Sequence, residues 1–311
     1  MTILVTGGAG FIGSNLCENL LKNGHRVIAV DNFITGNRLN LKVLQKYPNF
    51  QFIQHDITHP LVSINRQLST LDQIYHLACP TGVDNLIPLA QEMLLTNSAG
   101  TKNVLDLALT SGAKLVFTSS SEIYGDPQVS PQQEKYTGNV DPTGIRSPYE
   151  EGKRLSESMV SMYVRKYGLD AKIVRIFNTY GPFMSQKDNR AIPLFLRKAL
   201  NNEPLPVHGE GKQTRTFCYV DDLIIGLILV ADKGKTGDVY NLGSDEQITI
   251  YNLACKVIEF ANSKSEIKFV ERPKHDHQGR KPDLSKIKKF GWWPKISLRE
   301  GIIRTIQSQN Q

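Results

Sequence analysis

The chain has 311 residues, of which 40% are hydrophobic and 22% charged, and it carries a formal net charge of +7 with a pI near 9.1. This composition is typical of a globular protein with a large core, and no apolar run approaches the length of a membrane span. Basic residues are spread along the chain rather than interleaved with exposed aromatic residues, so we expect no nucleic-acid partner. The charge fits an anionic substrate, although a solvated basic surface explains it equally well.

The four cysteines, at positions 17, 79, 218 and 255, are widely separated and form no Cys-x-x-Cys pair. No cluster of histidines and acidic residues has the spacing of metal ligands, so we expect no metal. The first residues are those of a core strand, and we therefore expect no signal peptide. Reduced thiols, no membrane association and a cytoplasmic location are the resulting expectations.

The chain opens with an apolar strand expected over residues 2–6, followed by a glycine-rich turn and a helix expected over residues 11–23. Strand, turn and helix follow in the order that a dinucleotide site requires. The glycines permit a tight turn and a close approach of the backbone to a ligand, and the helix N-terminus offers N–H groups to a pyrophosphate. The residues expected to contact the cofactor here are Gly7, Gly10, Phe11, Ile12 and Gly13.

A second strand, expected over residues 26–30, ends at Asp31. Its carboxylate can hydrogen-bond the ribose hydroxyls of adenosine and repel a 2′-phosphate, so the sequence predicts NAD rather than NADP. Arg38, in the loop that follows, is the residue that could meet such a phosphate instead. A third strand over residues 50–55 leads to Asp56, which is either a contact for the adenine amino group or an ordinary acid at a strand end.

Further strands are expected over residues 72–77, 114–119 and 171–176, with helices near 86–111 and 147–168 between them. Such alternation predicts an α/β fold with a doubly wound parallel sheet.

After Gly181 the pattern changes to a helix near 190–202 and loops punctuated by glycine and proline, which predicts a smaller α/β substrate-binding lobe. Residues 220–231 and the strand 239–242 are expected to return to the main sheet. We therefore expect two discontinuous domains. The NAD-binding domain comprises residues 1–177 and 219–248, and the substrate-binding lobe comprises residues 178–218 and 249–311.

Tyr149 and Lys153 lie four residues apart on the expected helix and therefore share one face of it. An ammonium near a phenol lowers the pKa of the phenol, so that the phenol can act as a base near neutral pH. A Tyr-x-x-x-Lys pattern alone is common on amphipathic helices. Here Ser120 and Glu122 add a hydroxyl and a carboxylate, and together the four residues predict oxidation of a sugar alcohol by hydride transfer.

Motifs along nearly the whole chain carry a resemblance to a known family. They lie at residues 4–13, 30–36, 74–78, 96–97, 120–127, 144–154, 175–182, 213–217 and 280–283. With these motifs the chain resembles the extended short-chain dehydrogenases/reductases that act on nucleotide sugars, and within that family it is most similar to the UDP-glucuronate decarboxylases. The resemblance implies a Rossmann fold and a homodimer formed through the helices near 86–111 and 147–168.

The resemblance implies an NAD-dependent conversion of UDP-glucuronic acid to UDP-xylose through a 4-keto intermediate, with NAD recycled. In this reading Tyr149 takes the proton of the sugar 4-hydroxyl, Lys153 holds the nicotinamide ribose, and Ser120 hydrogen-bonds the same sugar oxygen. A 4-keto uronic acid is a β-keto acid, so its carboxylate can leave as carbon dioxide once the enolate is stabilised. The further cofactor contacts that the resemblance implies are Asn32, Asp56, Ile57, Leu77 and Asn97.

For the UDP-sugar substrate, the resemblance places Glu122 and Arg146 at the far end of the sugar. Two further arginines would bind the diphosphate, because guanidinium groups suit phosphate oxygens. Phe195 belongs either to the uracil pocket or to the core face of its helix, and we favour the core. The residues expected to bind the nucleotide sugar are Ser121, Arg146, Asn178, Arg215 and Arg280.

Sister reactions differ at one position. The family's 4,6-dehydratases carry an Asp-Glu pair where this chain has Ser121 and Glu122, and a serine hydroxyl is too weak an acid to expel water, so dehydration is disfavoured. Epimerisation at C4 needs only oxidation, rotation of the ketone and hydride return. The chain departs from the decarboxylase pattern at residues 81–87, Pro148 and Phe183, so 4-epimerisation remains the alternative. A non-catalytic NAD-binding protein is the least favoured reading, because the Tyr-Lys pair is present.

Overall fold

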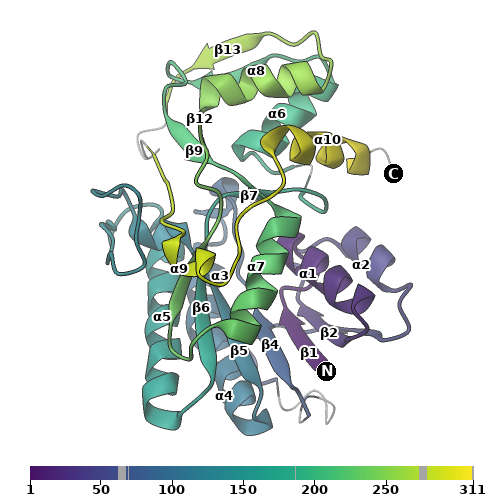
Figure 1. The fold of residues 1–311 in the computed structure, drawn as a ribbon, viewed down its shortest axis with the longest axis vertical. Coiled ribbons are helices and arrows are strands. Elements are labelled where there is room, and N and C mark those ends of the chain that lie inside the picture. The colour runs from purple at the N-terminus through teal and green to yellow at the C-terminus, as the bar shows by residue number, and fades with distance from the viewer. Residues whose placement is uncertain (62–67, 69, 186, 273–278, 310–311) are drawn as a thin grey trace.

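A seven-stranded parallel sheet forms the centre of the larger part of the molecule in this computed structural model (Figure 1). The structure describes residues 1–61, 68, 70–185, 187–272 and 279–309. The strand order is β11-β6-β5-β4-β1-β2-β3, and every pairing within the sheet is parallel. The strands are β1 (Thr2–Thr6), β2 (Arg26–Asp31), β3 (Phe50–Gln54), β4 (Gln73–His76), β5 (Lys114–Ser120), β6 (Ala171–Ile176) and β11 (Val239–Leu242).

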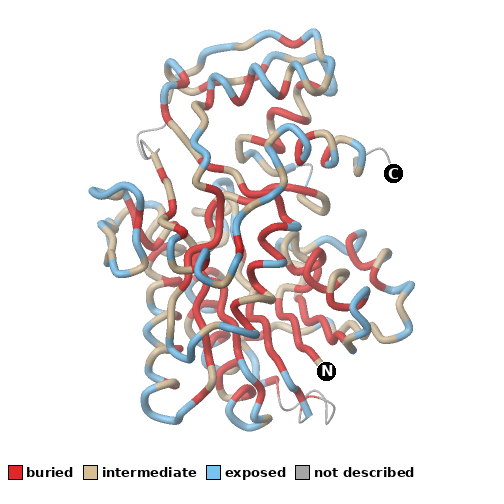
Figure 2. The backbone as a smooth tube through the Cα atoms, in the orientation of Figure 1, coloured by how far each residue is buried: buried red, intermediate tan, exposed pale blue. Residues whose placement is uncertain are grey.

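Helices cover both faces of this sheet, which confirms the predicted doubly wound fold. The helices of this part are α1 (Phe11–Lys22), α2 (Arg38–Leu44), α3 (Ala90–Leu95), α4 (Thr101–Ser111), α5 (Ser147–Tyr167) and α7 (Val220–Lys233). Side chains of β1 alternate between two core clusters: Ile3 and Val5 pack with α1, α2 and α7, whereas Leu4 packs with α4 and α5. Both faces are therefore buried, as Figure 2 shows for the strands at the centre of the molecule.

The helix expected over residues 86–111 is interrupted. Residues Thr96–Gly100 form a turn of π-helix between α3 and α4. Asn97 donates from Nδ2 to the carbonyl of Met93 at 2.8 Å, and the Thr101 hydroxyl donates to the carbonyl of Thr96 at 3.4 Å. Side chains that bond to backbone carbonyls in this way widen a helix locally.

A smaller part lies beyond the carboxyl ends of the sheet strands, at the top of Figure 1. It contains three two-stranded sheets: β8 with β13, β9 with β12, and β7 with β10. Its elements are β7 (Thr179–Tyr180), α6 (Ala191–Leu200), β8 (Leu205–His208), β9 (Thr214–Thr216), β10 (Cys218–Tyr219), β12 (Gln247–Thr249), α8 (Ile250–Phe260), β13 (Ile267–Val270) and α10 (Leu298–Gln309). Phe195 is buried in the core, as favoured from the sequence.

One segment of the C-terminal region runs back along the larger part. Short helix α9 (Ser285–Lys288) lies beside β11, where Lys286 Nζ donates to the carbonyl of Val239 at 2.8 Å. Lys288 Nζ pairs with Asp245 at 2.6 Å. None of the helices within the described ranges combines the length and the apolar character needed to cross a bilayer.

We predict that Gly13→Ala destabilises the fold much more than Gly10→Ala does. A Cβ at Gly13 would lie 2.1 Å from the carbonyl oxygen of Gly7, whereas a Cβ at Gly10 would lie 3.2 Å from the same oxygen. Only the first change forces α1 away from the turn, at a cost of about 2 kcal/mol. Urea unfolding of the two variants measures this difference, and equal losses would contradict the packing role of Gly13.

Candidate active site

A cleft of about 700 Å³ lies at the carboxyl ends of the sheet strands, facing the smaller part of the molecule. In parallel α/β sheets, ligands bind at this edge because loops from several strands meet there. The predicted site residues that line the cleft are Gly7, Gly10, Phe11, Ile12, Gly13, Asp31, Asn32, Ile57, Leu77, Ser120, Ser121, Glu122, Arg146, Tyr149, Lys153 and Asn178. The predicted residues outside its lining are Asp56, Asn97, Arg215 and Arg280.

The glycine-rich turn has the geometry of a phosphate cradle. Gly7 adopts a φ of 73°, and a Cβ there would lie 2.9 Å from the backbone of Ala78. Helix α1 begins at Phe11, and its N-cap, Gly10, has no side chain to cover the first N–H groups. The turn therefore leaves the helix N-terminus open to an anion.

Asp31 stands at the end of β2, as predicted. Its carboxylate accepts the N–H of Ala9 at 3.0 Å and the N–H of Phe33 at 2.8 Å. Burial raises the pKa of Asp31, against the lowering effect of these two hydrogen bonds. The carboxylate lines the cleft, where ribose hydroxyls can reach it. Arg38, in contrast, donates to Gln54 at 3.1 Å and stacks on the ring of Phe33.

Two predicted cofactor contacts, Asp56 and Asn97, are not among the residues that line the cleft. Asp56 accepts from Asn32 Nδ2 at 3.0 Å and from the N–H of Thr58 at 2.8 Å, so it holds Asn32 in place. Asn97 is almost fully buried and also donates to Cys79 Sγ at 3.2 Å. Sequence patterns can predict that such residues lie near a site, but they do not show whether a side chain lines the cleft or supports a residue that does.

Tyr149 and Lys153 project from α5 toward the end of β5. The Tyr149, Ser120 and Thr81 side chains all line the cleft, and Ser120 and Thr81 act on the pKa of the Tyr149 phenol. Lys153 is buried, and its Nζ donates to the carbonyl of Thr118 at 2.9 Å. Burial lowers the pKa of Lys153.

The pKa of Tyr149 shifts in the direction opposite to the prediction. Burial raises it most, the negative charge of Glu122 adds to this, and the hydrogen bonds from Ser120 and Thr81 do not compensate. The phenol is therefore protonated near neutral pH in this state. The sequence pattern indicated Thr81 only as part of the loop 81–87 that departs from the family, and no motif predicted that it lies near Tyr149.

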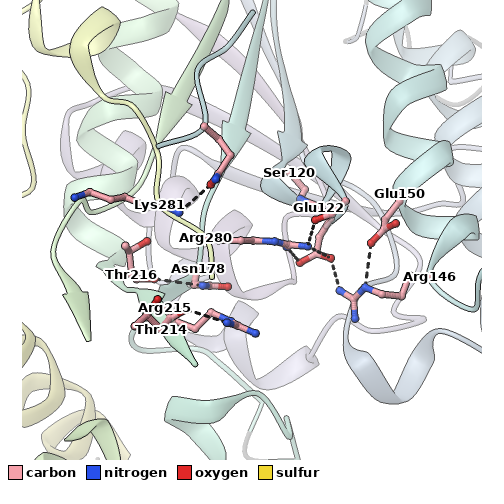
Figure 3. Close-up of polar contacts among 12 residues, drawn as sticks. Ser120, Glu122, Arg146, Glu150, Asn178, Thr214, Arg215, Thr216, Arg280 and Lys281 are labelled. Carbon is pink, nitrogen blue, oxygen red and sulfur yellow. Dashed lines mark hydrogen bonds and ion pairs between the residues drawn. The ribbon is translucent and has the colours of Figure 1, made fainter. Parts of the chain in front are cut away.

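Glu122 lies between two guanidinium groups (Figure 3). It belongs to the 3₁₀ turn Ser121–Tyr124 that follows β5. Arg146, which immediately precedes α5, pairs with one carboxylate oxygen, and Arg280 pairs with both. Arg146 Nε also donates to Glu150 at 3.0 Å.

These contacts fix the ionisation of Glu122. Burial alone would raise its pKa, but the charges of Arg280 and Arg146 and their hydrogen bonds outweigh burial and hold the pKa well below the usual range. Glu122 is thus a carboxylate at neutral pH, and both arginines are held near the reacting end of the cleft.

Arg280 and Arg215 contact different groups. Arg280 contacts Glu122, while Arg215 donates to the carbonyl of Thr214 at 2.8 Å, and Asn178 is drawn between the two arginines in Figure 3. Asn178 donates to the carbonyl of Thr216 at 3.3 Å. Across the described part of the chain, Ser119 Oγ, the Thr216 hydroxyl and Arg280 Nε are buried without a hydrogen-bond partner.

The cleft can therefore hold a dinucleotide against the glycine turn and Asp31, with a hydroxyl pair and an arginine-flanked carboxylate at its other end. No three histidine, cysteine, aspartate or glutamate side chains gather to hold a metal ion within the residues that the structure describes.

Comparisons with known proteins agree with this geometry. The chain is 45% identical to UDP-glucuronic acid decarboxylase 3 of Arabidopsis thaliana over 97% of its length and 87% of that protein. It superposes with a TM-score of 0.90 and 29% identity on UDP-glucose 4-epimerase from Thermotoga maritima with UDP-glucose, covering 100% of this chain and 99% of that one. The TM-score, identity and coverage are the same for a variant of UDP-glucuronic acid 4-epimerase from Bacillus cereus in complex with UDP-4-deoxy-4-fluoro-glucuronic acid and NAD.

A family model matches residues 3–243, which include the glycine turn, Asp31, Ser120, Tyr149 and Lys153. The chain belongs to the NAD dependent epimerase/dehydratase family.

Proposed function

We propose that the protein decarboxylates UDP-glucuronic acid to UDP-xylose through a 4-keto intermediate and recycles its NAD. The observation that carries this proposal is the position of Glu122 between Arg146 and Arg280, at the end of the cleft that holds Tyr149 and Ser120. The similarity to UDP-glucuronic acid decarboxylase 3 supports it.

The oxidation half of the reaction uses the hydroxyl pair. NAD⁺, when bound, accepts the hydride from C4 of the sugar and later returns it. Ser120 orients the 4-oxygen, and Tyr149 takes its proton as the ketone forms. The raised pKa keeps the Tyr149 phenol protonated, which is the form that the return step needs in order to give a proton to the ketone oxygen. The forward step needs the phenolate, so the phenol must lose its own proton before it takes that of the 4-hydroxyl. Lys153 places a positive charge beneath this site.

The decarboxylation half uses the charged end of the cleft. In the 4-keto intermediate the C5–C6 bond breaks, its electron pair passes into the enolate of C4 and C5, and carbon dioxide leaves. Arg146 and Arg280 stabilise the negative charge of the uronate and the enolate. Glu122 holds both guanidinium groups in place, and C5 then takes a proton that comes ultimately from solvent.

The alternative is 4-epimerisation of a UDP-uronate. It is favoured by the likeness to the Bacillus cereus 4-epimerase and by Thr81 and Phe183, which line the cleft and depart from the decarboxylase pattern. The two reactions share the oxidation half and differ only in the fate of the carboxylate.

The first prediction concerns the product. Purified protein with NAD⁺ and UDP-glucuronic acid is expected to release carbon dioxide and form a UDP-pentose, followed by mass spectrometry and proton NMR. Tyr149→Phe is expected to lower the rate about 10²- to 10⁴-fold, because general acid–base catalysis contributes that much. Tyr163→Phe on the same helix, whose hydroxyl only bonds Asp106 at 2.5 Å, is the control. An isomeric uronic acid of unchanged mass would replace decarboxylation by 4-epimerisation.

A second prediction compares the two carboxylates that contact Arg146. Glu122→Gln is expected to lower decarboxylation about 100-fold or more, because it frees both guanidinium groups from their fixed positions. Glu150→Gln, which changes the buried partner on α5, is expected to have a much smaller effect. Steady-state kinetics of the two variants decides this, and equal losses would contradict a specific role for Glu122.

The same Glu122→Gln variant has an expected effect on acid stability. The pKa of Glu122 is depressed in the folded state, so its stabilisation is present at neutral pH and is lost as the pH falls through that lowered pKa. The free energy of unfolding of the variant should therefore depend less on pH at the acid end than that of the native protein.

We further propose that the protein is a cytoplasmic homodimer. Leu155 and Met162 lie seven residues apart on α5, so they share one face, and they are 46% and 38% exposed. Leu94 and Leu95, on the neighbouring α3, are each 45% exposed. An apolar surface of this kind is typical of a protein interface. The four cysteines are free thiols, which supports the cytoplasmic location.

We predict that Leu155→Glu yields a monomer in light-scattering measurements. The introduced charge would be buried without a partner at the interface between the copies. Ile225→Glu on α7, where Ile225 is 52% exposed, is the matched control and should leave the dimer intact. A monomeric native protein would overturn this proposal.

A further inference from the structure

Arg280 reaches Glu122 from a short segment, residues 279–283, that we call the Arg280 segment. Gln132, in the loop between β5 and α5, forms three hydrogen bonds with the backbone of this segment, two through its own backbone and one through its side chain. The N–H of Gln132 donates to the carbonyl of Lys281, the N–H of Lys281 donates to Gln132 Oε1, and the N–H of Asp283 donates to the carbonyl of Gln132, each at 2.8 Å. Gln132 is fully buried.

Asn241, on β11, connects Gln132 and the Arg280 segment to the turn that carries Glu122. Its Nδ2 donates to the carbonyl of Gln132 at 3.0 Å and to the carbonyl of Asp283 at 3.3 Å. Its Oδ1 accepts the hydroxyl of Tyr124 at 2.8 Å, and Tyr124 lies two residues beyond Glu122. Asn241 is also fully buried.

The contacts close into a ring. From Glu122 they pass through Arg280 to Gln132, then through Asn241 to Tyr124 and back to the 3₁₀ turn. Arg280 adds a second link to that turn by donating to the carbonyl of Gly125 at 3.3 Å.

Arg175 anchors the ring to the sheet. Its Nη1 donates to the Tyr124 hydroxyl at 3.0 Å, and its guanidinium pairs with Glu157 at 2.8 and 2.9 Å. A buried hydrogen-bonded network of this kind favours one arrangement of its members.

The Arg280 side chain depends on this ring for its position. Its guanidinium contacts Glu122 and Gly125, while its Nε has no partner among the described residues. Among the described residues, the Arg280 side chain makes no hydrogen bond to the smaller part, so its direction follows from where the backbone of residues 279–283 is held. The ring fixes that backbone relative to Glu122.

We propose that Gln132 is a positioning residue for the reaction: it acts through Arg280 by holding the Arg280 segment in register with Glu122. This proposal rests on the proposed decarboxylase function. It assigns a task to a residue about 150 positions away in sequence from the group it positions.

A double-mutant cycle tests whether Gln132 acts through Arg280. Gln132→Ala is expected to lower kcat/KM for UDP-glucuronic acid about tenfold, and Arg280→Ala to lower it more. Adding Gln132→Ala to Arg280→Ala should change kcat/KM by less than about twofold, because residues that act as one unit are not additive. Losses that multiply would show that Gln132 acts independently of Arg280 and would overturn the proposal.

The pH profile separates positioning from general destabilisation. Glu122 faces Arg146, Arg280 and Tyr149, and the charges of Arg280 and Arg146 lower its pKa. If Arg280 moves away in Gln132→Ala, the pKa of Glu122 rises and the acid limb of kcat/KM moves to higher pH. Tyr124→Phe, which removes one link of the ring, should shift the limb in the same direction. Tyr163→Phe should leave it unchanged, and an unmoved limb in Gln132→Ala would contradict the proposal.

A measurement without substrate separates this proposal from the proposed function. In Gln132→Ala, the amide of Lys281, which loses its acceptor Oε1, should exchange with solvent at least about tenfold faster. The amide of Asp283, which donates to the backbone carbonyl that alanine retains, should change less, and the amide of Asn241, which donates to Glu134 at 3.0 Å, should exchange at the native rate. Unchanged exchange at residue 281 would overturn the positioning role. If exchange is faster in Gln132→Ala but the native protein does not turn over UDP-glucuronic acid, the positioning of the Arg280 segment by Gln132 stands and the proposed function is wrong.

Discussion

The site depends on one buried carboxylate that two guanidinium groups share. Removing Glu122 and its partners from water costs several kcal/mol per ion, and the pairing offsets this cost only when the geometry is good. Arg280 is 3% exposed, so without Glu122 its charge would be buried with no carboxylate partner. The cluster also draws together three regions of the chain: the turn after β5, the start of α5 and the Arg280 segment.

The parallel sheet makes this convergence possible. Because β1, β2, β4 and β5 all run in the same direction, their carboxyl ends present the glycine turn, Asp31, Leu77 and Ser120 at one edge. Helix α5 crosses the end of β5 and adds Tyr149 from its first turn. The residues for hydride transfer and the charged cluster around Glu122 therefore lie at neighbouring ends of one cleft, where a single sugar can reach both.

The sequence predicted the parts of this structure that are local. The strand, glycine turn and helix at residues 2–22 follow from their pattern, and so do the acid at the end of β2 and the presence of Tyr149 and Ser120 in one cleft. The π-helical turn at Thr96–Gly100 was missed because it arises from side-chain bonds to the backbone rather than from periodicity.

Contacts between residues far apart in the chain could not be predicted from sequence patterns. Glu122 and Arg280 lie 158 residues apart, and nothing in either motif says that the two side chains meet. The direction of the Tyr149 pKa was wrong for a related reason: the spacing to Lys153 was visible, but the burial and the nearby Cys79 and Glu122 depend on the folded surroundings.

The position of the charged cluster bears on the choice between the two reactions. A 4-epimerase needs groups that oxidise C4 and let the ketone turn, and Tyr149 and Ser120 already meet the first need. A buried Arg280 and a half-buried Arg146, joined by Glu122, add nothing to hydride transfer at C4. Glu122 and Glu150 balance the charges of the two arginines, so the cluster supplies fixed guanidinium groups rather than an excess of positive charge. Such groups suit a substrate that carries a carboxylate, and decarboxylation and 4-epimerisation of a uronate share that requirement. The preference for loss of the carboxylate therefore rests on the similarity to the UDP-glucuronic acid decarboxylases.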